Sequence, residues 1–233
     1  MENGENLYLE LFRVSRAELE GLMAKALSSG ADFADIYFEC TNYTNLLLKD
    51  SQVTSGGYHE DFGAGIRVLC GERTGYSCCE TTERRDMEAA VGAAAAICAA
   101  GGCTRNVRAG HAPSGSKYGN AHEKAAAGIK PRDGLYGMKD SWESCSRRKM
   151  AELLKRIDEE LRRRDPRVVK VIAQISDSVS RVMMFNSLGE LTFETRPMGS
   201  VSVSAVFSGH GLDGKPTNIT KSESRSFRMG AEM

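Results

Sequence analysis

Apolar residues first recur at helical spacing near the amino terminus. Ser15 and Glu18 form a capping box, in which each side chain can bond an otherwise unpaired backbone N–H. Gly30 suits the left-handed conformation in which helices often end. Between them lies one apolar stripe, made of Leu19, Leu22, Met23, Ala26 and Leu27. The pattern predicts a helix that begins after Ser15 and ends before Gly30.

The next residues alternate between apolar and polar, which is the period of a half-buried strand. We expect a loop around residues 55–57, a tight turn at Gly71-Glu72, and four short strands at 34–40, 46–48, 66–70 and 74–79. A second helix is predicted from Thr82 to Gly101. Its apolar face would be Met87, Ala90, Val91, Ala94 and Cys98.

Periodicity is lost from Cys103 to Ser146, where Gly, Ser, Lys and Arg dominate, and this favours a polar linker. A third helix then carries Met150, Leu153, Leu154, Ile157 and Leu161 at helical spacing. It should end at Asp165, because the residue before a proline avoids the helical region. Further strands are predicted at 169–175, 181–185, 191–195 and 201–207.

The two ordered stretches share one plan, a helix with several strands joined by hairpin-length connections. We therefore expect an α+β fold, in which two helix-plus-antiparallel-strand units form a layered sheet/helix domain. Unit one would span about 15–101 and unit two about 147–208, joined by the polar linker at about 102–146. The tail, 209–233, lacks strand alternation and is predicted to be atypical.

Composition narrows the possible partners and location. Lys plus Arg and Asp plus Glu both number 31, and this balance argues against a nucleic-acid or membrane-surface partner. Most of the seven cysteines lie in apolar segments, which favours reduced thiols packed in the core. The acidic first residues do not resemble a signal peptide, and no apolar run is long enough to cross a bilayer. We expect a cytoplasmic protein.

The chain offers two His-Glu pairs, His59-Glu60 and His122-Glu123, as candidates for a metal site. A zinc-protease helix needs a second histidine one turn after the first, and neither pair has one. His111 and His210 also lack partners at ligand spacing. The glycines of 63–65 and 71–75 are typical of tight turns, because neither set matches a phosphate-binding loop. We assign no catalytic, cofactor-binding or metal-ligating residue.

Cys79 is the one candidate nucleophile. It lies three residues before the predicted Thr82 helix, whose amino end could lower a thiol pKa, and His59 could act as its base. Cys40, Cys70 and Cys78 instead fit the alternating apolar face. Packing is therefore the better explanation of these cysteines, and a thiol enzyme is the weaker hypothesis.

Short strings in both halves resemble a known family. In the first half they are Ala31-Asp-Phe-Ala-Asp-Ile-Tyr-Phe-Glu39, Gly63-Ala-Gly-Ile-Arg-Val-Leu69 and Gly71-Glu-Arg-Thr-Gly-Tyr76. In the second half they are Glu152-Leu-Leu-Lys-Arg-Ile-Asp158, Asp165-Pro-Arg-Val-Val169, Ser176-Asp-Ser178, Asn186-Ser-Leu-Gly189, Thr195-Arg-Pro197 and Ser200-Val-Ser-Val203. Their order and spacing are similar to the amino-terminal domain of the TldD/PmbA family of zinc metalloproteases, and the Asp-Pro-Arg-Val and Thr-Arg-Pro strings favour its TldD branch.

The resemblance implies a domain that helps enclose the channel leading unfolded peptides to zinc, in a homodimer or heterodimer with a TldD/PmbA-type subunit. In the family, an HExxxH helix and a later cysteine of a carboxy-terminal domain hold the zinc. This chain ends at Met233 before any such helix, so we expect a truncated form without the catalytic carboxy-terminal domain and with no zinc of its own. The alternative is a non-catalytic module that binds an extended peptide at a sheet edge.

Overall fold

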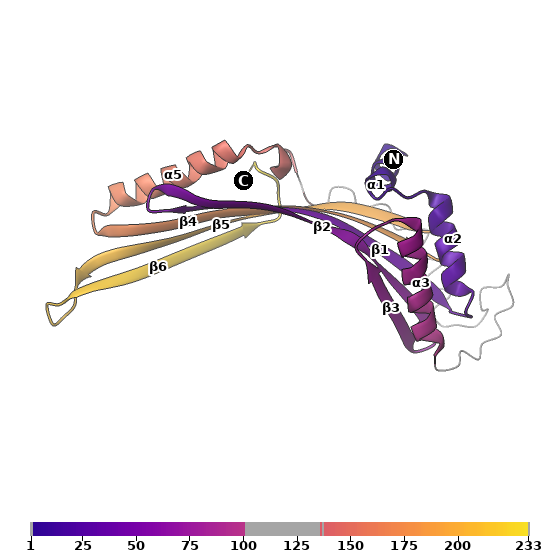
Figure 1. Cartoon of the computed structure of the whole chain (residues 1–233). Coiled ribbons are helices and arrows are strands. Elements are labelled where there is room, and N and C mark those ends of the chain that lie inside the picture. Colours follow the sequence, from indigo (N-terminus) through magenta and orange to yellow (C-terminus); the bar gives the residue numbers. More distant parts are fainter. Residues whose placement is uncertain (1, 101–135, 137, 233) are drawn as a thin grey trace. The chain divides into compact units, whose positions relative to one another are not determined.

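The computed structural model describes residues 2–100, 136 and 138–232 (Figure 1). Its helices are α1 (Glu2–Leu11), α2 (Arg16–Leu27), α3 (Arg84–Ala99), the short 3-10 helix η1 (Trp142–Ser144) and α5 (Arg147–Arg164). Its strands are β1 (Phe33–Lys49), β2 (Gln52–Cys70), β3 (Arg73–Cys79), β4 (Val168–Asn186), β5 (Leu191–His210) and β6 (Pro216–Phe227). The described strands form one six-stranded sheet in the order β3-β2-β1-β4-β5-β6. The predicted α+β class is confirmed.

The structure divides into two compact units that interleave along the chain. Unit one comprises Met1–Cys40, Asp61–Asp133 and Arg181–Glu194, and unit two comprises Thr41–Glu60, Gly134–Ser180 and Thr195–Met233. This differs from the sequential units expected from the sequence, because the long strands β1, β2, β4 and β5 each contribute one part to each unit. The alternation of apolar and polar residues predicts each strand, but it does not show where a strand passes from one unit to the other.

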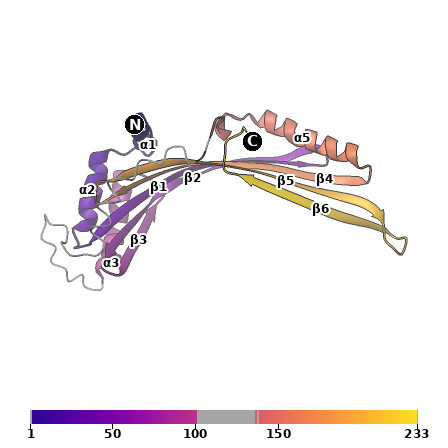
Figure 2. The same cartoon turned by 180° about the vertical axis from the view of Figure 1, so that it is seen from behind.

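In unit one, helices α2 and α3 lie side by side on the sheet, and Figure 2 shows the same arrangement from behind. The predicted capping box is present at Ser15 and Glu18. The predicted stripes of α2 and α3 are buried with strand residues such as Phe38 and Ile66, except for Leu27, which is partly buried. Helix α1 was not predicted; Phe12, the residue that follows it, is fully buried, and its ring centroid lies 5.3 Å from that of Phe38.

Gly75 of β3 sets how closely α3 can approach the sheet. A Cβ atom at this position would overlap the backbone carbonyl of Ala94 in α3. Only glycine lets the two backbones approach this closely. The sheet and helix of unit one therefore pack backbone against backbone at this point.

In unit two, α5 lies along the strands (Figure 1). Met150 and Leu154 are its most deeply buried apolar residues, and they belong to one core with Leu48 and Ile175. Ser146 caps the helix by accepting a hydrogen bond from the backbone N–H of Lys149. The helical spacing that predicted this element is confirmed, as is its end at Asp165.

Three local predictions were wrong. The short strands predicted at 34–40 and 46–48, at 169–175 and 181–185, and at 191–195 and 201–207 are joined in β1, β4 and β5, respectively. Residues 55–57 lie inside β2 rather than in a loop, since their glycines face the side chains of Asn45 and Leu46 on the neighbouring strand and leave them room. The tail forms β6, which pairs antiparallel with β5 from His210↔Pro216 to Gly199↔Phe227. Exposed serines and threonines hide this strand from a search for apolar alternation.

Part of the predicted linker is ordered, because residues 142–144 form η1 and Ser146 caps α5. Most of the remainder, 102–135 and 137, lies outside the described residues. Cys40, Cys78, Cys79, Cys98 and Cys145 are free thiols, as expected, but Cys70 is disulfide-bonded and Cys78 is exposed rather than packed. Within the described ranges, no helix has the length and apolar character needed to cross a membrane.

Candidate functional site

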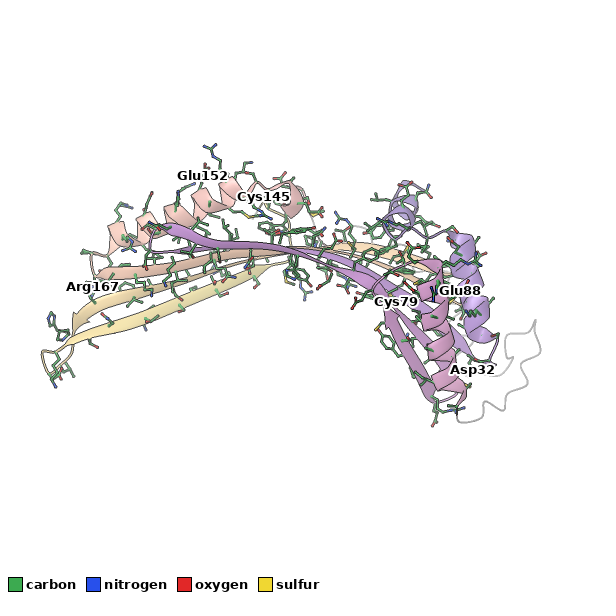
Figure 3. All side chains as sticks on the ribbon, viewed as in Figure 1. Asp32, Cys79, Glu88, Cys145, Glu152 and Arg167 are labelled. Atoms are coloured by element: carbon green, nitrogen blue, oxygen red, sulfur yellow. The ribbon has the colours of Figure 1, made fainter. Side chains whose placement is uncertain are left out.

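A pocket of about 310 Å³ opens in unit two where η1 and the start of α5 face three strands. Figure 3 labels one of its residues, Cys145, between η1 and α5. The strands contribute Asn42 and Thr44 from β1, Tyr58 from β2, and Asp177 and Val179 from β4; η1, α5 and their junction contribute Trp142, Glu143, Cys145, Arg147 and Met150.

Asp177 is the unusual residue of this pocket. Only 8% of its surface is exposed, and its Oδ2 atom is buried with no hydrogen-bond partner among the described residues. Burial raises the pKa of Asp177 to about 6; the Arg147 charge opposes this rise and the Glu143 charge adds to it. A buried acceptor without a donor is costly, so the site is suited to a ligand that supplies one.

A chain of hydrogen bonds fixes one rim of the pocket. The Tyr58 hydroxyl donates to Asn42 Oδ1 at 2.8 Å, and Asn42 Nδ2 donates to Glu143 Oε1 at 2.8 Å. These bonds join β2, β1 and η1. Because the three polar groups satisfy one another, they hold the rim in place without bonding Asp177.

Another part of the lining is apolar and is also held by specific contacts. Trp142 is buried, and its indole N–H donates to the backbone carbonyl of Met229 at 2.8 Å. The ring lies so close to Gly199 of β5 that a Cβ there would overlap it. Met150 and Val179 line the pocket beside it. A small organic group could therefore place a polar atom at Asp177 and an alkyl part against Trp142.

Cys145 lines the same pocket, but its thiol is not primed as a nucleophile. Burial raises its pKa, and the charges of Asp177 and Asp140 add to the rise while Lys149 opposes it. A reactive cysteine needs the opposite shift. The pocket is therefore better suited to binding than to thiol chemistry.

The histidines considered from sequence do not converge on a metal site. His59 stacks on Tyr43 with ring centroids 4.4 Å apart, and His210 is exposed at the end of β5. His111 and the His122-Glu123 pair lie outside the described residues. Among the described residues, no three His, Cys, Asp or Glu side chains could share a metal ion.

Cys79 is held by packing contacts in unit one. Its sulfur lies 3.5 Å from that of Met87, and burial raises the thiol pKa, with the charges of Asp86 and Cys78 adding to the rise (Figure 3). The first turn of α3, which begins at Arg84, contacts the thiol through Met87, but the thiol pKa is raised rather than lowered. The candidate base His59 belongs to unit two. These findings favour packing over the thiol-enzyme hypothesis.

Two models of one family match the chain in order. The PmbA/TldA metallopeptidase domain 1 matches residues 34–98, and the PmbA/TldA metallopeptidase central domain matches residues 141–231. Together they cover about two thirds of the chain. The chain belongs to the PmbA/TldD family. The resemblance inferred from sequence is thus confirmed, and it extends through the tail.

Curated relatives place the chain near the TldD members of the PmbA/TldD family. It is 26% identical over 180 residues to the metalloprotease TldD homolog of Haemophilus influenzae, and 25% identical over 181 residues to that of Buchnera aphidicola from Acyrthosiphon pisum. Each match covers 77% of this chain and 34% of the relative. The chain therefore spans about a third of the length of these proteins.

Solved structures share the fold at lower identity. A protein of Thermotoga maritima described as a putative modulator of a DNA gyrase matches with a TM-score of 0.67 and 18% identity, over 93% of this chain and 44% of its own. TldE from Thermococcus kodakarensis matches with a TM-score of 0.55 and 15% identity, over 91% of this chain and 43% of its own. These likenesses support the PmbA/TldD fold alone.

Asp177 lies in the Ser176-Asp-Ser178 string of the family resemblance, but no role was predicted for it. A signal was nevertheless present. Asp177 occupies the same alternating phase as Ala173, Ile175 and Val179, all of which are buried. An acidic residue in the apolar phase of a strand predicts either a buried partner or a ligand.

Proposed function

We propose that this chain is the amino-terminal part of a TldD-type metallopeptidase that degrades or processes unfolded peptides. In this role it forms part of the substrate-channel wall and a dimerisation surface, while zinc chemistry takes place in other parts of the enzyme. The observation that carries the proposal is the ordered match to the first and central domains of the family over residues 34–98 and 141–231.

The described residues do not fit the zinc that the family implies, since no three potential ligands lie together among them. We therefore assign no metal ligand among the described residues and derive no catalytic step from them. The expected partner is another TldD/PmbA-type subunit, in a homodimer or a heterodimer. The proposed location is the cytoplasm, where such an enzyme would meet unfolded peptides.

The test is to purify the 233-residue chain and measure its zinc by elemental analysis and its cleavage of an unfolded casein substrate. We expect less than about 0.1 zinc per chain and no cleavage that a chelator abolishes. Light scattering then measures its mass alone and with a TldE-type subunit. Stoichiometric zinc or chelator-sensitive cleavage would overturn the non-catalytic role, and failure to associate with itself or the subunit would overturn the dimerisation role.

A second candidate is a free-standing, non-catalytic peptide-binding module. It is favoured by β6, which is the last strand in the order of the described sheet and whose residues are exposed from Pro216 to Ser226. An edge strand of this length can take up an extended peptide by strand addition. Lys221, Glu223 and Arg225 place alternating charges along it, which usually discourages such pairing.

Fluorescence anisotropy with a labelled unfolded peptide separates the two candidates. Saturable binding by the chain alone, lost when β6 is shortened together with its hairpin partner, supports the module. Binding that appears only in the presence of a TldE-type subunit supports the peptidase role.

A further inference from the structure

The buried acceptor of Asp177 gives the pocket in unit two a specific chemical preference. Oδ2 lacks a donor among the described residues, while Tyr58, Asn42 and Glu143 bond one another along the rim. A ligand that enters must therefore bring its own N–H or O–H group to Asp177. An anion would instead meet two carboxylates, Asp177 and Glu143, against the single guanidinium of Arg147.

We propose that this pocket binds a primary ammonium group carried on a short alkyl chain, such as a lysine side chain or the amino terminus of a peptide. The ammonium would donate to Asp177, and the alkyl part would lie against Trp142, Met150 and Val179. Two acidic side chains and one basic side chain leave the pocket with one excess negative charge, which matches a monocation. The inference does not depend on the role proposed above.

The apolar part of the lining explains why an alkyl ammonium fits better than a bare cation. Trp142 is held by its bond to the Met229 carbonyl and by contact with Gly199, so its ring is a fixed apolar surface. An inorganic cation would need several oxygen ligands, and no group of three potential ligands is present among the described residues. An ammonium group needs fewer acceptors and gains from the apolar contact.

The chain carries its own reporter for this binding, because Trp142 is its single tryptophan and it lines the pocket. We would titrate the full chain with n-butylammonium chloride at pH 7.5 and follow tryptophan fluorescence. Sodium chloride controls for ionic strength, and n-butanol controls for the alkyl chain. We expect a saturable change with the ammonium ion and none with either control.

Asp177→Asn removes the charge while keeping the shape of the side chain. It should weaken butylammonium binding about tenfold or more, as expected for the loss of a charged hydrogen bond. Asp213→Asn is the matched control, since Asp213 is an exposed acid elsewhere in unit two, and it should bind like the parent chain. Circular dichroism then tests whether both variants remain folded.

Binding by the parent chain should strengthen from pH 5 to pH 7.5 as Asp177 ionises, and binding by Asp177→Asn should change less. Other charged residues also lie around the pocket, namely Glu143, Arg147, Lys149, Asp140 and Glu60. The readout is therefore the difference in pH dependence between the parent chain and Asp177→Asn.

Two further ligands distinguish the two possible sources of the ammonium group. Alanyl-leucine amide presents an amino terminus, and Nα-acetyl-lysine methylamide presents only a side-chain ammonium.

Saturable binding of either ligand with loss in Asp177→Asn supports the inference and identifies its source. Three results would overturn it: no saturable change up to about 50 mM butylammonium, an equal response to butanol, or equal affinity in the parent chain and Asp177→Asn.

Discussion

The Ser51 hydroxyl donates a hydrogen bond of 2.6 Å to Asp158 Oδ2, which joins the β1–β2 turn to the middle of α5. Asp158 is 2% exposed and also accepts from Arg162 Nε at 3.0 Å. Ser51 itself has a φ of 67°, a conformation that favours glycine. The buried carboxylate of Asp158 thus fixes the strained β1–β2 turn against α5.

We predict that Asp158→Ala destabilises the chain by about 2–4 kcal/mol, because it leaves Ser51 and Arg162 without their shared acceptor. Urea unfolding followed by circular dichroism measures the change. Glu159→Ala is the matched control, since the neighbouring side chain is exposed on the same helix, and it should change stability by less than about 0.5 kcal/mol. Equal stability of the two variants would contradict the role given to Asp158.

Two substitutions at Ser51 separate the hydrogen bond from the backbone strain. Ser51→Ala loses the bond and keeps the strain, and should cost about 1–2 kcal/mol. Ser51→Gly loses the same bond but relieves the positive φ, so it should cost less than Ser51→Ala. The order of the two unfolding midpoints in urea tests this prediction, and the reverse order would show that the turn is not strained.

Gly75→Ala should destabilise unit one by about 2–4 kcal/mol, because the added methyl group would overlap the Ala94 carbonyl and push α3 away from β3. Gly92→Ala, within α3 itself, meets no atom within 4 Å and should stabilise the chain by up to about 1 kcal/mol. Thermal unfolding of both variants measures the contrast. A neutral Gly75→Ala would mean that the helix can shift at little cost.

Local patterns in the sequence predicted most elements but not how they combine. The stripe from Leu19 to Ala26 and the capping box at Ser15 depend on nearby residues alone, so they were predicted correctly. Strand β6 was missed because its side chains face solvent, and its pairing with β5 is decided by backbone hydrogen bonds that no side-chain pattern records.

The candidate site could not be predicted from the sequence, for a related reason. Asp177 comes from β4, Asn42 from β1, Tyr58 from β2 and Trp142 from η1, so only the fold brings them together. The acidic residue in an apolar phase was visible in the sequence, but its missing donor was not. Of the candidates considered from sequence, His59 stacks on Tyr43 and Cys79 packs against Met87.

Cysteine reactivity should follow burial and pKa rather than proximity to a helix end. Cys78 is exposed, whereas Cys79 is half-buried with a raised pKa. We expect iodoacetamide at pH 7.5 to modify Cys78 before Cys79, and Cys79 no faster than a model thiol. Mass spectrometry of a time course measures both rates. Modification of Cys79 faster than of Cys78 and of the model thiol would support the thiol-enzyme hypothesis.

Asp177 should give the chain a pH dependence opposite to that of its surface acids. Because the pKa of Asp177 rises from 3.8 unfolded to about 6 folded, the folded state binds more protons between these values. Stability therefore falls as pH rises from about 4 to about 6, and the full penalty, at most about 3 kcal/mol, is present above pH 6. Asp165 and Glu160 have pKa values lowered to about 2, so their contribution instead falls as pH drops below about 4.5.

Asp177→Asn isolates this effect, since it leaves the surface acids unchanged. We expect the variant to be more stable than the parent chain by about 1–3 kcal/mol at pH 7.5, and the difference to shrink as pH falls towards 4. Urea unfolding at pH 4.5, 5.5, 6.5 and 7.5 measures it for both chains. A difference that does not vary with pH would contradict the raised pKa, because only a proton taken up on folding makes the stability gain depend on pH.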